Sequence, residues 1–118
     1  MNPASDDGVK AMGAGETTRD HEQLAQMFRA LGHPTRLGIV AKIISGEFCV
    51  IDLQEHLDRS QANLSQHLAV LRDRGLAIPE RRGNKVCYRL ADERITQIVT
   101  LAADVAGTVR RAALSNED

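Results

Sequence analysis

Residues 60 to 75 read S-Q-A-N-L-S-Q-H-L-A-V-L-R-D-R-G, a pattern that predicts one amphipathic helix. Ser60 is a favourable N-cap residue, because its hydroxyl can accept a hydrogen bond from a free amide of the first turn. Three leucines recur at helical spacing and share one face, which we expect to be buried: Leu64, Leu68 and Leu71. Gly75 ends the helix, since glycine adopts the positive φ of a helix C-terminus without strain.

The other face of this helix carries uncharged side chains that both donate and accept hydrogen bonds. They are Gln61, Asn63, Ser65 and Gln66, with His67 beside them. Such groups read base edges in the major groove of DNA, whereas a plain solvated helix would usually carry Glu and Lys. We expect these five side chains to face the major groove and Ser60 to cap the helix close to a phosphate.

The residues just upstream complete a recognisable motif. Residues 52–57 predict a short helix, and Asp58-Arg59-Ser60 predicts the turn that joins it to the polar-faced helix. A short helix, a tight turn and a second, outward-facing helix form the helix-turn-helix pattern.

A basic hairpin is predicted directly after this motif. Residues 76–78 and 86–90 favour strands, and residues 79–85 between them contain R-R-G-N-K with Gly-Asn at the tip. We interpret this hairpin as a wing whose tip reaches phosphate or the minor groove. The side chains expected to serve it are Arg81, Arg82, Asn84 and Lys85.

The charge distribution fits that interpretation better than the total charge does. The net charge is −1, but six basic residues lie between positions 72 and 89: Arg72, Arg74, Arg81, Arg82, Lys85 and Arg89. Only Asp73 and Glu80 oppose them there, and seven other acids lie toward the two ends of the chain: Asp6, Asp7, Glu16, Asp20, Glu22, Glu117 and Asp118. One basic face on a neutral body is compatible with DNA contact.

The remaining segments predict a mainly α-helical single domain of 118 residues. We expect a disordered tail over residues 1–19, the domain over residues 20–113 and a short tail over residues 114–118. Helices are predicted from Asp20 to Leu31 and from Pro34 to just before Gly46, with a very short strand within residues 47–51. The inward positions should be Leu24, Met27, Phe28 and Leu31 in the first helix, and Leu37, Val40, Ile43 and Ile44 in the second.

The last helix, residues 91 to about 113, has more apolar surface than so small a domain can cover. Its apolar stripe consists of Ile95, Ile98, Ala102, Val105 and Val109. We therefore predict that it pairs with its symmetry mate and with the first helix to form a twofold homodimer. Two recognition helices about one turn of DNA apart would read a palindromic operator. No run of about 18 apolar residues and no secretory signal is found, so we expect no membrane partner and a cytoplasmic protein.

Four stretches resemble the ArsR/SmtB-type repressors. They are L-G-H-P-T-R-L-x-I-V (31–40), E-F-C-V-I-D-L (47–53), L-S-Q-H-L-A-V-L-R-D-R-G-L (64–76) and R-R-G-N-K-V-C-Y-R-L (81–90). The resemblance covers residues 21 to 112. It implies a homodimeric winged helix-turn-helix with two helices, a short strand, two helices, two strands and a final helix. It also implies repression of an operator that an inducer relieves.

The family's metal sites are not matched. Its arsenic-type site has the pattern C-V-C-D-L-C, but Ile51 and Gln54 replace the second and third thiols, so only Cys49 remains. Its zinc-type site uses Asp and His on the last helix, and no histidine follows His67. We expect no metal site and no cofactor.

The only two cysteines are the candidate effector site. Cys49 and Cys87 are expected on neighbouring strands, with Val86, Tyr88 and Leu90 facing the core and both thiols projecting outward from one face. Phe48 and Val50 should likewise point inward. A disulfide between the cysteines is possible there, and Lys85 and Arg89 would favour the thiolate.

We interpret the pair as a sensor of oxidant, sulfane sulfur or a trivalent arsenical. Alternatively, both cysteines are small half-buried residues without a role. Some winged helices contact only other proteins, so an interaction module is the rival to DNA binding. An enzyme is not expected, because no phosphate-binding loop, paired catalytic carboxylates or activated nucleophile is found.

Overall fold

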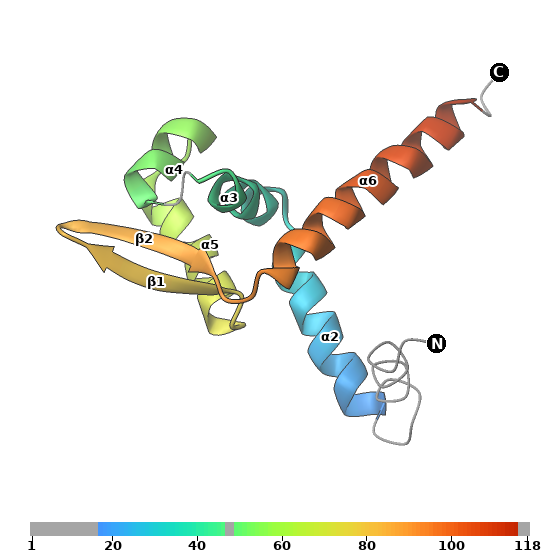
Figure 1. The fold of residues 1–118 in the computed structure, drawn as a ribbon, viewed down its shortest axis with the longest axis horizontal. Coiled ribbons are helices and arrows are strands. Elements are labelled where there is room, and N and C mark those ends of the chain that lie inside the picture. Colours follow the sequence, from blue (N-terminus) through green and yellow to red (C-terminus); the bar gives the residue numbers. More distant parts are fainter. Residues whose placement is uncertain (1–16, 47–48, 116–118) are drawn as a thin grey trace.

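The computed structural model describes residues 17–46 and 49–115, which form five helices and one β-hairpin within these ranges (Figure 1). In chain order the elements are α2 (Thr17–Leu31), α3 (Pro34–Ile44), α4 (Val50–Leu57), α5 (Gln61–Asp73), β1 (Ala77–Arg82), β2 (Lys85–Leu90) and α6 (Arg94–Ser115). The predicted order of helices and strands is confirmed. The predicted first strand is reduced to Cys49, which forms an isolated antiparallel bridge with Cys87. Phe48 lies outside the described residues.

Local signals set both ends of α5 as predicted. The Ser60 hydroxyl accepts the Asn63 backbone N–H at 3.1 Å, and so caps the first turn. At the other end Gly75 has a φ of 73°, and its N–H donates to the Arg72 carbonyl while the Leu76 N–H donates to the Leu71 carbonyl. This pair of hydrogen bonds closes the helix and turns the chain into β1.

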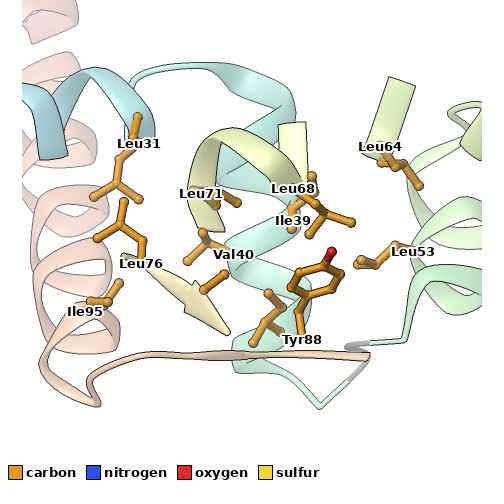
Figure 2. Close-up of a cluster of buried hydrophobic side chains, with 13 residues drawn as sticks. Leu31, Ile39, Val40, Leu53, Leu64, Leu68, Leu71, Leu76, Tyr88 and Ile95 are labelled. Atoms are coloured by element: carbon orange, nitrogen blue, oxygen red, sulfur yellow. The ribbon is translucent and has the colours of Figure 1, made fainter. Parts of the chain in front are cut away.

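The hydrophobic core lies behind α5. Leu64 and Leu71 have no exposed surface and Leu68 is 1% exposed. Figure 2 shows Leu68 beside Ile39 of α3 and Tyr88 of β2, with Leu53 of α4 at the same side of the cluster. Helices α2, α3 and α4 and the hairpin therefore hold the inner face of α5, and its outer face must point to solvent.

The inward face of α3 was predicted correctly in part. Val40 and Ile43 are buried as predicted, but Ile39 is also buried, and Leu37 and Ile44 are exposed. The true core stripe is rotated from the predicted one, because α3 packs between α4, α5 and β2 rather than against a single neighbour. Leu37 and Ile44 extend past the edges of that contact.

The wing is a longer hairpin than predicted. The strands β1 and β2 pair in antiparallel register from Ala77 opposite Leu90 to Arg82 opposite Lys85, leaving only Gly83 and Asn84 in the turn. Residues 79–82 were predicted as loop but belong to β1. Pro79 is accommodated because β1 is the edge strand of this two-stranded sheet.

The first and last helices project from the body in different directions (Figure 1). Helix α2 begins at Thr17, so Thr17–Arg19 are helical rather than part of the predicted tail. Helix α6 begins at Arg94, whose backbone N–H donates to Asp92 Oδ1 at 2.8 Å, and it ends at Ser115, two residues beyond the prediction. Residues 1–16 and 116–118, the rest of the predicted tails, lie outside the described residues.

Large apolar side chains remain uncovered on these two helices. Leu101 is 64% exposed, Val109 63%, Val105 52%, and Phe28 of α2 53%. Phe28 was predicted to face the core, but only the end of α2, at Ala30 and Leu31, is buried. Figure 2 shows Leu31 near Leu76 and Ile95, the contact that anchors both helices to the body.

Replacing the cap of α5 should destabilise the whole domain. We expect Ser60→Ala to lower the free energy of unfolding by about 0.5–2 kcal/mol, because the Asn63 amide loses its acceptor. Urea denaturation followed by circular dichroism measures this change. Ser65→Ala, at an exposed interior position of the same helix, is the control and should leave stability unchanged or slightly raised. Equal losses for the two variants would contradict the capping role.

Candidate DNA-binding surface and cysteine pair

Three of the predicted base-reading side chains project from α5 into solvent. Gln61, Ser65 and Gln66 are exposed on the side of the helix away from its buried leucines. Their amides and hydroxyl can each donate and accept hydrogen bonds. A short α4, a turn at Asp58 with a φ of 49° and the outward α5 give this surface the geometry of a helix that enters a groove.

The other two predicted side chains, Asn63 and His67, are directed to the flank of α5. Asn63 is half-buried, and its Oδ1 is enclosed without a hydrogen-bond partner. His67 is also half-buried, with its Nδ1 atom 3.3 Å from Nη1 of Arg36 in α3. Its ring lies 4.5 Å from that of His33. Both residues lie on the helical flank that meets α3, so they do not share the outward face with Gln66.

The surroundings of His67 favour its neutral form. Its pKa is lowered first by desolvation and then by the charges of His33, Arg36 and Arg59. A neutral, partly enclosed imidazole that accepts a hydrogen bond from Arg36 is a structural contact rather than a free group for reading bases.

A groove joins the recognition helix to the wing. It has a volume of about 430 Å³, and its lining includes Gln61 and Ser65 from α5 and Asn84 and Lys85 from the hairpin. The apolar part of its lining comes from α4, α5 and β2: Val50, Ile51, Leu68, Val86 and Tyr88. Polar helix side chains and the wing tip therefore face the same space.

The wing carries the four side chains predicted for it on exposed positions: Arg81, Arg82, Asn84 and Lys85. Arg82 is paired with Glu80 at 3.4 Å, and Arg89 donates its Nε–H to the same carboxylate at 2.5 Å. The contact of Glu80 with two arginines was not predicted. Glu80 lies opposite Cys87 in the hairpin register, and Arg89 lies two residues further along the same strand, so the pairing of the strands could have indicated this contact.

The two cysteines are joined by a disulfide, with their Cα atoms 3.8 Å apart. The expectation that they lie side by side is confirmed, but the expectation that both thiols project to solvent is wrong. Cys87 has no exposed surface and Cys49 is half-buried, because the chain entering α4 lies along β2 and covers Cys87. Val86, predicted inward, is instead 39% exposed in the groove, and Arg89 binds Glu80.

The bridge lies at the boundary between the helix-turn-helix and the wing. Cys49 is the N-cap residue of α4, and the next two residues, Val50 and Ile51, line the groove. Cys87 lies between Val86 and Tyr88, which line the same groove from β2. A bond formed or broken at these sulfurs is therefore next to the residues of α4 and of β2 that line the groove.

The described residues contain neither a cluster of metal ligands nor a helix that could span a membrane. Within residues 17–46 and 49–115, no three His, Cys, Asp or Glu side chains are grouped closely enough to hold a metal ion. No helix in this part of the chain has the length and apolar character needed to cross a bilayer.

A helix-turn-helix followed by a β-hairpin that flanks its recognition helix defines a winged helix-turn-helix domain. Residues 33–78 match the model of the bacterial regulatory protein arsR family. The chain is 31% identical to the biofilm growth-associated repressor of Xylella fastidiosa over 84% of this chain and 87% of that protein. The protein belongs to the arsR family of bacterial regulatory proteins.

Two further similarities refine this placement. The arsenical resistance operon repressor of Escherichia coli is 48% identical over 56% of this chain and 57% of that repressor. The solution structure of the homodimeric winged helix-turn-helix DNA-binding domain Mb0332 from Mycobacterium bovis superposes with a TM-score of 0.72 and 26% identity, covering 80% of this chain and 87% of that one.

Proposed function

We propose that this protein is a homodimeric transcriptional repressor that binds a palindromic operator in double-stranded DNA and is released by a thiol-directed signal at Cys49 and Cys87. The observation that carries the first part is the shared groove, in which exposed amide and hydroxyl groups of α5 face the wing tip. Gln61, Ser65 and Gln66 read base edges, while Arg81, Arg82, Asn84 and Lys85 contact phosphate or the minor groove. The protein acts in the cytoplasm and has no catalytic role.

The proposal assigns the second copy of the chain to the uncovered apolar faces of α2 and α6. Leu101, Val105 and Val109 expose apolar surface along several turns of α6, and Phe28 does so on α2. Burying such apolar surface in a dimer contributes a favourable free energy of about 25 cal/mol for each Å² removed from water. The homodimeric relative from Mycobacterium bovis supports this assignment. Twofold pairing would present two copies of α5 to the two halves of a palindrome.

The proposed signal changes the covalent link between the wing and the helix-turn-helix. In the oxidant version, two thiols lose two protons and two electrons as the S–S bond forms, and a peroxide takes them up to give two molecules of water. The bridge then ties the N-cap of α4 to the middle of β2. Because the bridge fixes α4 relative to β2, it restricts how α5 and the wing can fit together onto DNA. Alternatively, two persulfide molecules would insert one sulfur atom between the cysteine sulfurs, releasing hydrogen sulfide and two thiols. Arsenite would bind both sulfurs through arsenic, with the two thiol protons leaving in two molecules of water.

Variants on α5 and on the wing should affect DNA binding differently. We expect Gln66→Ala to cost about 1–3 kcal/mol of operator affinity and to relax selectivity at one base position. Lys85→Gln should weaken binding to all duplexes and lower the slope of log affinity against log salt by about 1. Fluorescence anisotropy measures both effects, using an operator selected from a random duplex pool and a scrambled duplex. Arg110→Gln, at an exposed position near the end of α6, is the control.

The outcomes separate the proposed repressor from its rival. Selective binding that responds as described supports DNA recognition by α5 and the wing. If the wild-type protein selects no duplex and shows no salt-dependent DNA binding, the domain is an interaction module and the proposal fails.

The thiol signal is tested with a Cys49→Ser/Cys87→Ser double variant. We expect hydrogen peroxide to lower operator affinity of the wild type about 5- to 150-fold, the usual range for coupling between two sites, and dithiothreitol to restore it. The double variant should bind at the reduced wild-type affinity and ignore peroxide. A parallel arm uses arsenite with the reduced proteins. Equal release of both proteins would show that the cysteines have no sensing role.

A further inference from the structure

A cluster of one arginine and two histidines lies where α2, α3 and α5 meet. Arg36, in the first turn of α3, donates its Nε–H to the Ala30 carbonyl at 2.5 Å and an Nη2–H to the Arg29 carbonyl at 3.1 Å. These carbonyls belong to the last turn of α2, whose C-terminus attracts positive charge. Arg36 therefore caps α2.

The same guanidinium also reaches the recognition helix. Its Nη1 lies 3.3 Å from Nδ1 of His67 in α5. Because arginine has only donors, Nδ1 of His67 must be the acceptor and can carry no proton in this contact. Arg36 thus links the end of α2 to α5 through three hydrogen bonds of one planar group.

The second histidine of the cluster has a different partner. Nδ1 of His33 accepts the Thr35 backbone N–H at 3.1 Å, which makes His33 the N-cap of α3. The two rings lie 4.5 Å apart, so the start of α3 places both Arg36 and His33 beside His67.

We propose that Arg36 is a positioning residue that holds α5 against α2 only while His67 is neutral, so that operator binding weakens on acidification. This inference rests on the proposed DNA-binding function and adds a regulation to it. Protonation of Nδ1 of His67 removes the acceptor from Arg36. It also places a second positive charge beside the guanidinium of Arg36, which repels it.

The charged surroundings reinforce this effect. The groups whose charge acts on His67 are His33 and Arg36 at the start of α3 and Arg59 in the turn before α5, and α2 contributes neutral carbonyls. All three are cationic when charged. The pKa of His67 is lowered from 6.5, so the unfolded chain binds this proton more readily. The contact therefore contributes stability above about pH 6.5, and that contribution is lost as pH falls through the lower folded-state pKa.

The geometry also indicates why the effect should reach the DNA surface. Helix α2 belongs to the proposed dimer interface and α5 to the proposed recognition surface, so Arg36 connects the two. A second connection, between Arg74 Nη1 and Gln26 Oε1 at 3.2 Å, involves no group that titrates near neutrality. It should hold the C-terminal end of α5 while the contact at His67, in the middle of the helix, is released, which shifts the helix rather than unfolding it.

The test compares the wild type with His67→Gln, whose amide oxygen can still accept from Arg36 but does not titrate. Affinity for a selected operator duplex and for a scrambled duplex is measured by anisotropy at about pH 7.5 and about pH 5.5, at constant ionic strength. His21→Gln, at an exposed histidine on α2, is the matched control. Circular dichroism at both pH values verifies that each protein is folded.

We expect the operator-to-scrambled affinity ratio of the wild type and of His21→Gln to fall at least about fivefold on acidification, within the limit of about tenfold per pH unit for each proton. The ratio for His67→Gln should change by less than about twofold. An equal fall in His67→Gln, or no fall in the wild type, overturns the inference while leaving operator binding intact. Absence of any operator preference at the higher pH contradicts the proposed function instead.

If the protein shows no operator preference, a measurement without DNA still tests the role of His67. The Tm of the wild type should decrease more between the two pH values than the Tm of His67→Gln, because only in the wild type does the unfolded chain bind a proton at residue 67 more readily than the folded protein does. Parallel decreases would overturn the role of His67.

Discussion

The burial of three leucines behind α5 is the constraint on which the surface chemistry depends. Leu64, Leu68 and Leu71 are enclosed by α3, α4 and the hairpin, and truncating one buried leucine typically costs about 2–5 kcal/mol. Rotating α5 about its axis would expose all three. Gln61, Ser65 and Gln66 are consequently held outward by core packing, and the flank with Asn63 and His67 is held against α3.

The same packing places the two proposed regulatory elements around α5. The wing lies along one flank and shares a groove with Gln61 and Ser65, and the Cys49–Cys87 bridge joins α4 to the β2 side of that groove. The Arg36 cluster lies at the other flank and connects α5 to α2. The proposed covalent signal and the proposed protonation would therefore act on one helix from opposite sides, each through residues other than Gln61, Ser65 and Gln66.

Sequence alone predicted the features that depend on neighbouring residues. The Ser60 cap, the Gly75 stop, the R-R-G-N-K turn and the exposed Val105 and Val109 of the last helix all follow from local chemistry or periodicity, although Ile95 of the same predicted stripe is buried in the core. It could not predict which flank of each helix meets another element. Asn63 and His67 were placed with Gln66 because α3 was not known to pack beside them, and Ile39 was overlooked for the same reason. The covering of Cys87 likewise depends on where a distant segment lies.

The outward orientation of α5 toward DNA is tested most directly by photo-crosslinking. A benzoylphenylalanine residue is introduced at Gln66 in one variant and at the exposed Gln97 of α6 in another, and each protein is irradiated with a selected operator duplex. The structure predicts crosslinks to bases from position 66 and none from position 97. Efficient operator binding with crosslinks only from position 97, or from neither position, would contradict the account.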